Sequence, residues 1–152
     1  MNKFYDEDLV DDQDEIFTPV YQSLMLNPKY SGNEVLAWIG LKNYAIGSKR
    51  HLWAKKKSLA KSCKLSETTL WRTLTKLEEK GVIVIIPNYN ENWKQVSNNY
   101  YLAKFDPEKG DWKKESLDLA RKQKARVLEA YNLYISLKKE KELGQGGTRT
   151  NS

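Results

Sequence analysis

The sequence predicts a mainly α-helical domain with a small β-hairpin, followed by a long C-terminal helix. Apolar residues recur at helical spacing in segments between residues 31 and 80. The β-branched run Val82-Ile83-Val84-Ile85-Ile86 then favours a strand, and residues 111–143 form a charged amphipathic stretch. With 152 residues and 39% hydrophobic content, the chain is large enough for one compact core with appendages.

The first long helix has a well-marked start. Ser31 and Glu34 have the spacing of a capping box. In this motif each of the two side chains accepts a hydrogen bond from the backbone N–H of the other residue. The residues from Val35 to Leu41 are apolar nearly all round, so this should be the most buried helix. It is expected to end between Tyr44 and Gly47.

Two shorter helices, about residues 56–64 and 67–80, follow with a tight turn between them. Ala60 is small where two helices are expected to cross closely. Ser66 is the expected N-cap of the second helix, and Gly81 the left-handed residue that closes it.

A β-hairpin is expected next. Its first strand covers residues 82–86 and ends at Pro87, its loop covers residues 88–95, and its second strand covers residues 96–102. A brief strand is also expected at residues 52–54. Three helices followed by strand, turn and strand are the order of a winged helix-turn-helix domain.

The same segments resemble a known family. They are Phe17-Thr18-Pro19-Val20, Asn27-Pro28-Lys29-Tyr30-Ser31, Leu59-Ala60 to Leu74, Leu77-Glu78-Glu79-Lys80-Gly81-Val82-Ile83 and Ser97-Asn98-Asn99-Tyr100-Tyr101-Leu102. Over most of residues 17–105 the chain is similar to the winged helix-turn-helix domains of phage and plasmid replication initiators and related bacterial regulators. The resemblance implies binding of nucleic acid. One departure from the family is Lys64, at a position where such turns commonly carry glycine. A lysine in the left-handed backbone conformation costs roughly 1 kcal/mol relative to glycine.

The exposed arc of the second short helix supplies the candidate reading residues. Leu70, Leu74 and Leu77 share one face, so the opposite arc is expected to enter the major groove of duplex DNA. The candidates for contact with base edges are Glu67, Thr68, Trp71 and Arg72. Trp71 has two interpretations, contact at the groove edge or packing against the hairpin.

Two further groups complete the expected interface. The candidates for contact with phosphates are Lys55, Lys56, Lys57, Lys64, Ser66, Thr75 and Lys76. The candidates in the hairpin loop, the wing, are Tyr89, Asn92, Trp93 and Lys94. The two aromatic residues of the wing stand among polar neighbours, which suggests contact with a groove wall or with another subunit.

Charge is distributed unevenly along the chain. Residues 1–15 hold seven acidic residues and one lysine, a net charge of −6. Residues 42–80 hold eleven Lys and Arg and three Asp and Glu, a net charge of +8. Such a basic segment suits a surface that faces phosphates, and the acidic segment is expected to be mobile and to compete with DNA for it.

The ends of the chain are expected to lie outside the domain of residues 16–105. Residues 144–152 contain no apolar residue and should be disordered. The amphipathic helix of residues 111–143 either forms a homodimer or packs back on its own domain, and the dimer is favoured because a winged helix already closes its own core.

No enzyme activity, metal or cofactor is expected. Cys63 is the only cysteine and His51 the only histidine, so no disulfide, zinc site or histidine-based triad can be assembled. The start of the chain lacks the layout of a signal peptide, and no apolar run is long enough to span a membrane, so a cytoplasmic protein is expected.

The predicted function is therefore sequence-specific binding of double-stranded DNA. The resemblance points to a plasmid or phage, with a role in transcription regulation or in control of replication or transfer. Two alternatives remain open: an adaptor whose winged helix docks proteins, and a small replication initiator that recruits replication or transfer proteins.

Overall fold

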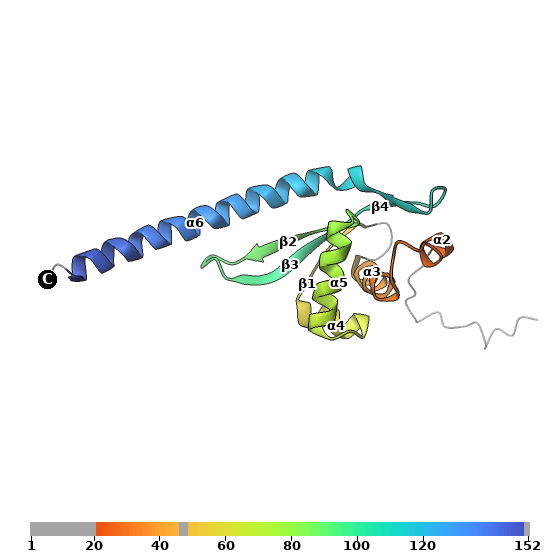
Figure 1. The fold of residues 1–152 in the computed structure, drawn as a ribbon, viewed down its shortest axis with the longest axis horizontal. Helices are drawn as coiled ribbons and strands as arrows, with labels where there is room; N and C mark the ends of the chain where they lie inside the picture. Colours follow the sequence, from red (N-terminus) through yellow and green to blue (C-terminus); the bar gives the residue numbers. More distant parts are fainter. Residues whose placement is uncertain (1–20, 46–48, 151–152) are drawn as a thin grey trace, which may run out of the picture.

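The computed structural model describes residues 21–45 and 49–150, and side chains as far as residue 144. Figure 1 shows a helical domain with a small sheet, from which one long helix extends. This confirms the predicted fold class. The elements are α2 (Gln22–Met25), α3 (Gly32–Ala45), β1 (His51–Ala54), α4 (Lys56–Cys63), α5 (Glu67–Glu79), β2 (Ile83–Tyr89), β3 (Gln95–Leu102), β4 (Lys104–Asp106), β5 (Asp111–Lys113), the 3-10 helix η1 (Lys114–Leu117) and α6 (Asp118–Thr150). The acidic segment of residues 1–15 lies outside the described residues.

The sheet has the antiparallel order β1-β3-β2. Leu52, Tyr100 and Ile85 lie opposite one another across the three strands, and all three are buried. Directly opposed residues share a sheet face, so this face is the one that meets the helices. The core there includes the leucines that α5 turns inward, Leu70, Leu74 and Leu77, as predicted.

The capping predictions are confirmed. Ser31 Oγ accepts a hydrogen bond from Glu34 N at 3.2 Å, and Ser66 Oγ accepts one from Thr69 N at 3.1 Å. Gly81 has a φ of 77°. Lys64 ends α4 in the left-handed region, with φ 54° and ψ 38°, so the turn keeps the glycine-like geometry with a lysine side chain.

A close crossing of α3 and α4 lies at a residue that the sequence pattern did not single out. A Cβ atom placed on Gly40 of α3 would lie 2.2 Å from the Sγ atom of Cys63 on α4. Ala60 is buried as well, but it is Gly40 that allows this approach. The position of α4, and with it the first half of the helix-turn-helix, depends on this contact.

The first strand of the hairpin continues past Pro87, contrary to the prediction. β2 is an edge strand and ends at Tyr89. Ile85 donates its backbone N–H to Glu78 Oε2 at 2.7 Å instead of to β3. The backbone N–H groups of a strand point alternately toward and away from its neighbour. Pro87 lies two residues after Ile85, so its missing N–H would also point away from β3 and no hydrogen bond between the strands is lost.

The expected helix start at residue 111 is wrong. Asp111–Lys113 is a strand that pairs with Lys104–Asp106, and α6 begins only at Asp118. Trp112 and Leu117 are buried in the main core, so the domain does not close at residue 105. Disorder was also predicted from Gly144 onward, but the backbone of α6 continues as a helix to Thr150. No proline interrupts the helix in this segment.

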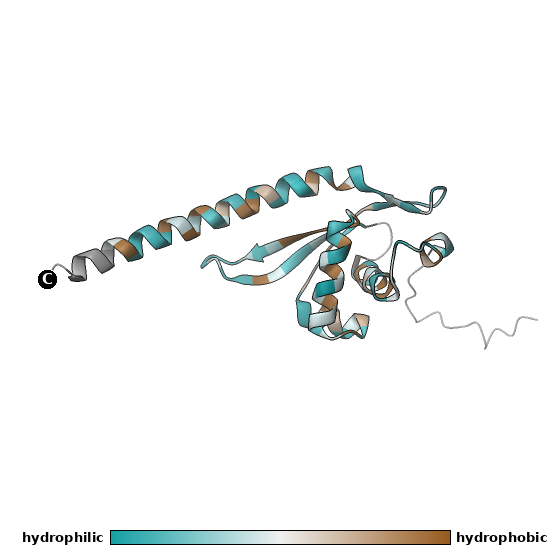
Figure 2. Cartoon of the chain, in the orientation of Figure 1, coloured by the Kyte–Doolittle hydropathy of each residue, from teal (hydrophilic) through white to brown (hydrophobic). Residues whose placement is uncertain are grey.

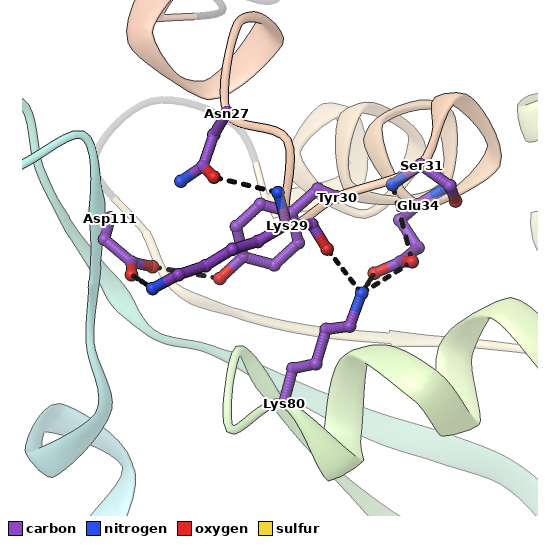
Figure 3. Close-up of polar contacts among 7 residues, drawn as sticks. All are labelled: Asn27, Lys29, Tyr30, Ser31, Glu34, Lys80 and Asp111. Carbon is purple, nitrogen blue, oxygen red and sulfur yellow. Dashed lines mark hydrogen bonds and ion pairs between the residues drawn. The ribbon is translucent and has the colours of Figure 1, made fainter.

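A polar cluster attaches β5 to the helices (Figure 3). Asp111 accepts a hydrogen bond from the Tyr30 hydroxyl at 2.9 Å and pairs with Lys29 at 2.8 Å. The Glu34 carboxylate, 5% exposed, pairs with Lys80 Nζ at the end of α5 at 2.7 Å. These contacts join α3, α5 and the strand that leads into α6.

Candidate nucleic-acid interface

The exposed arc of α5 presents the predicted side chains. Glu67, Thr68, Trp71, Arg72 and Lys76 are all exposed, and Thr75 is partly exposed. They share this arc because the leucines on the opposite face are buried in the core. The structure therefore brings the base-edge candidates together on one side of a single helix.

The cations of this arc are free to meet a ligand. Within the described part of the chain, neither Arg72 nor Lys76 takes part in an ion pair. By contrast, Glu78 in the last turn of α5 is paired with Lys124, and Lys80 just beyond the helix is paired with Glu34. The C-terminal end of α5 thus serves the fold, while the cations Arg72 and Lys76 on its exposed arc remain unpaired among the described residues.

Trp71 has a lysine over its ring. Lys56 Nζ lies 3.9 Å from the centroid of the Trp71 ring, and the residue remains 37% exposed. An ammonium over an indole face is attracted by the negative ring surface. This contact places the start of α4 beside the exposed arc of α5.

The start of α4 is the second part of the surface. Lys55, Lys56 and Lys57 are exposed, and no side chain caps the helix at Lys55. The first backbone N–H groups of a helix favour anions, and three lysines add to this preference. A cleft of about 300 Å³ lies between Lys55, Lys56 and the first residues of β3, Gln95–Asn98. It continues the surface from α4 to the base of the wing.

Three other phosphate candidates differ in what they offer. Lys64 is exposed in the turn. The Ser66 hydroxyl is occupied by capping and by a 2.9 Å bond to Thr69 Oγ1. The Thr75 hydroxyl donates to the Trp71 carbonyl oxygen at 2.8 Å. The two hydroxyl groups are therefore less available as donors than the lysine.

The wing loop has a built conformation. Asn90 Oδ1 accepts hydrogen bonds from the backbone N–H groups of Asn92 at 3.0 Å and Lys94 at 2.9 Å. Trp93 takes a φ of 58°. Asn92 and Lys94 are exposed, and their contact with DNA stays a prediction.

The two aromatic residues of the wing face the protein's own helix. Tyr89 is stacked on Tyr131 of α6 with centroids 4.6 Å apart, and Trp93 on Tyr134 at 5.4 Å. Burial and the neighbouring Tyr131 raise the pKa of Tyr89. Packing within the chain accounts for both rings, and their contact with a groove wall or another subunit stays a prediction. We call these four residues the wing clamp.

A polar contact reinforces this attachment nearer the sheet. Glu78 Oε2 accepts hydrogen bonds from Ile85 N and from Lys124 Nζ, the latter at 2.8 Å. One carboxylate therefore joins α5, β2 and α6. Tyr131 and Tyr134 belong to the amphipathic stretch of residues 111–143, but the sequence pattern did not identify the wing as their partner.

The described residues show no cluster of metal ligands. None of their His, Cys, Asp and Glu side chains gather in groups of three or more that could hold a metal. His51 Nε2 is hydrogen-bonded to Asn99 Oδ1 at 2.8 Å, and burial raises the pKa of the Cys63 thiol to about 11. Among the helices that the structure describes, none is both long and apolar enough to span a bilayer.

Comparison with known proteins adds little. No protein-family profile matches the chain, and no curated protein matches its sequence. Among solved structures, the chain is similar to a possible transcriptional regulator from Methanosarcina mazei Go1, with a TM-score of 0.37 and 14% identity over 78% of this chain and 81% of that chain. A TM-score of this size does not establish a common fold.

Proposed function

We propose that the chain binds duplex DNA sequence-specifically, with α5 in the major groove and without enzyme activity. The observation that carries the proposal is the exposed arc of α5, where Thr68, Trp71 and Arg72 lie beside the lysine-rich start of α4. Arginine reads guanine edges in the major groove, and lysines at a helix start hold the phosphates.

The wing extends this surface toward the flanking DNA. Asn92 and Lys94 provide exposed polar groups at its tip, while its aromatic residues hold it against α6. In the proposed complex the wing approaches the flanking backbone or minor groove with a fixed direction. Rigid placement lowers the entropy cost of binding.

The biological role that fits this proposal is control of transcription, or of replication or transfer, in a plasmid or phage. It rests on the resemblance of the helix-turn-helix segments to replication-initiator and regulator domains. A homodimer through α6 and contacts with replication or transfer proteins belong to the same proposal.

Selection of bound sequences from a random duplex pool is the first experiment. A single enriched motif is expected. Arg72→Ala should then weaken binding to that motif by about 1–3 kcal/mol and random duplex much less. Lys56→Ala should weaken both targets similarly and reduce the salt dependence by about one unit of slope. Lys113→Ala, an exposed lysine on β5, is the matched control and should change neither.

The opposite results are equally informative. If Arg72→Ala lowered the affinity for all DNA sequences equally, Arg72 would be assigned to the residues that contact phosphates. No duplex binding by the wild-type protein, together with loss of a protein partner in the Arg72→Ala variant, would replace the proposal with the adaptor function.

A further inference from the structure

Trp53 is the most exposed tryptophan of the described residues. It lies on β1 and is 63% exposed. His51, two residues earlier, lies on the same sheet face and stacks on Tyr101 with centroids 4.6 Å apart. Neither the core nor the proposed duplex interface uses the Trp53 ring. The indole of Trp53 therefore remains available to a ligand on the same sheet face as the His51–Tyr101 stack.

A basin opens beside this residue. It has a volume of about 650 Å³ and lies between the end of α3, the edge of β1 and the start of α4. The residues that line it include three with aromatic rings, two lysines and a serine: Tyr44, His51, Trp53, Lys49, Lys55 and Ser58. The volume falls within the range of small-ligand sites and exceeds that of a single nucleobase.

The backbone of β1 adds hydrogen-bonding groups to the basin. β1 is an edge strand, and the Arg50 carbonyl oxygen accepts a bond from Leu102 N on its β3 side at 2.7 Å. Because bonding alternates along an antiparallel strand, the backbone groups of His51 and Trp53 face the opposite, open edge. A base that stacks on Trp53 meets donors and acceptors at this edge.

The charge around the basin favours phosphate. From Val35 to Ser66 the sequence has no Asp or Glu, and Lys49 and Lys55 stand at the two ends of β1. Cations on a backbone path combined with open aromatic rings are the pattern of single-strand recognition. In a duplex both faces of a base are already stacked on neighbours, so an open indole fits an unpaired base.

We propose that this basin binds single-stranded nucleic acid, with an unpaired base stacked on Trp53 and its phosphates at Lys49 and Lys55. The site goes beyond the proposed duplex binding. It adjoins that interface at Lys55, which lines both the basin and the cleft at the wing base. A strand that leaves a duplex on α5 therefore has a continuous basic path into the basin.

The test compares two labelled probes on the full-length protein by fluorescence anisotropy: an oligo(dT) strand of about 10 nucleotides, within the usual site size, and a random duplex. Trp53→Ala should weaken oligo(dT) binding at least about fivefold and leave duplex binding unchanged. Trp53→Phe keeps a ring and should retain most of the affinity. Leu36→Ala, an exposed apolar residue elsewhere on α3, is the control and should change neither.

Three results would overturn the inference: no binding of oligo(dT) by the wild-type protein, no effect of Trp53→Ala on it, or an equal loss on both probes. Circular dichroism of each variant confirms that it is folded. Binding of oligo(dT) without binding of duplex would instead refute the proposed function and leave this site standing.

Discussion

Tyr131 of α6 lies parallel to Tyr89 of the wing, with an interplanar angle of 4° between their rings. The two residues are 42 positions apart in sequence, and their stack makes the long helix a support for the wing. Trp93 contacts the same tyrosine with centroids 6.3 Å apart. The direction of the wing is therefore determined by α6 and not by the hairpin alone.

Tyr131→Ala should release the wing. Loss of the stack on Tyr89 should lower the free energy of unfolding by about 1–2 kcal/mol, since aromatic pairs add to the area they bury. Hydrogen exchange should accelerate at the Asn90 and Trp93 amides of the wing loop and remain slow in β1. Tyr131→Phe keeps the ring and is the control. Unchanged exchange in the wing of Tyr131→Ala would show that the hairpin holds itself.

Features that depend on residues close together in sequence could be predicted, whereas features that depend on residues far apart in sequence could not. The helix-turn-helix boundaries depend on neighbours within four residues, such as Ser66 and Thr69, so their signals are readable in the sequence. The burial of Tyr89 depends on a residue far along the chain. The polar residues around Tyr89 predicted that its side chain would be exposed. No sequence signal near Tyr89 indicates that Tyr131 packs against it.

The same reason explains the misplaced start of α6. Residues 111–117 are largely charged and continue into the amphipathic stretch, yet Asp111–Lys113 pairs with Lys104–Asp106 and Trp112 enters the core. Pairing across a short hairpin outweighs a weak local helix preference. The exposed arc of α5 was predicted well because burial of its leucines determines the opposite face.

Gly40→Ala should destabilise the protein although alanine favours helices. The new methyl group would lie 2.2 Å from Cys63 Sγ, and such overpacking costs about 1–3 kcal/mol, more than the roughly 1 kcal/mol gained in helix propensity. Cys63→Ala removes the sulfur, so the double variant should recover much of the loss. Urea unfolding of the four proteins measures the coupling. Additive effects of the two substitutions would show that the helices adjust freely.

Acid should weaken the cluster around Asp111. Burial alone would raise the pKa of Asp111, but hydrogen bonds from Lys29, the Trp112 N–H and Tyr30 together lower it below its ordinary value of 3.8. Between the folded and unfolded pKa values the unfolded chain binds more protons, so stability falls as pH decreases through this window. The contribution is fully present above about pH 5.

Urea unfolding at several pH values checks this expectation. The free-energy difference between wild type and Asp111→Asn should be constant near neutral pH and shrink as pH falls below about 4. Tyr30→Phe retains the Lys29 pair and should show a smaller change. A difference that stays constant down to about pH 3 would mean that Asp111 adds no pH-dependent stability.

The distal half of α6 is expected to join two copies of the chain. Leu133 and Leu137 are one helical turn apart and are 61% and 56% exposed, while the wing clamp uses another face of the helix. Figure 2 shows apolar residues recurring along α6 beyond the tip of the wing. Trp112 and Leu117 belong to the core. A truncation that removes α6 together with residues 111–117 would therefore unfold the domain, and it cannot test dimerisation separately from folding.

Replacing both leucines by glutamate is the sharper test, because it leaves Tyr131 and Tyr134 in place. Sedimentation at tens of micromolar, where an association of about 7 kcal/mol is visible, should show a dimer for wild type and a monomer for the Leu133→Glu, Leu137→Glu variant. Leu119→Glu changes a more exposed leucine near the start of α6, 80% exposed, and should leave the dimer intact. A dimer would present two α5 helices to half-sites related by two-fold symmetry, so selected DNA sequences should be palindromic. A monomeric wild-type protein with a non-palindromic motif would assign α6 to support of the wing alone.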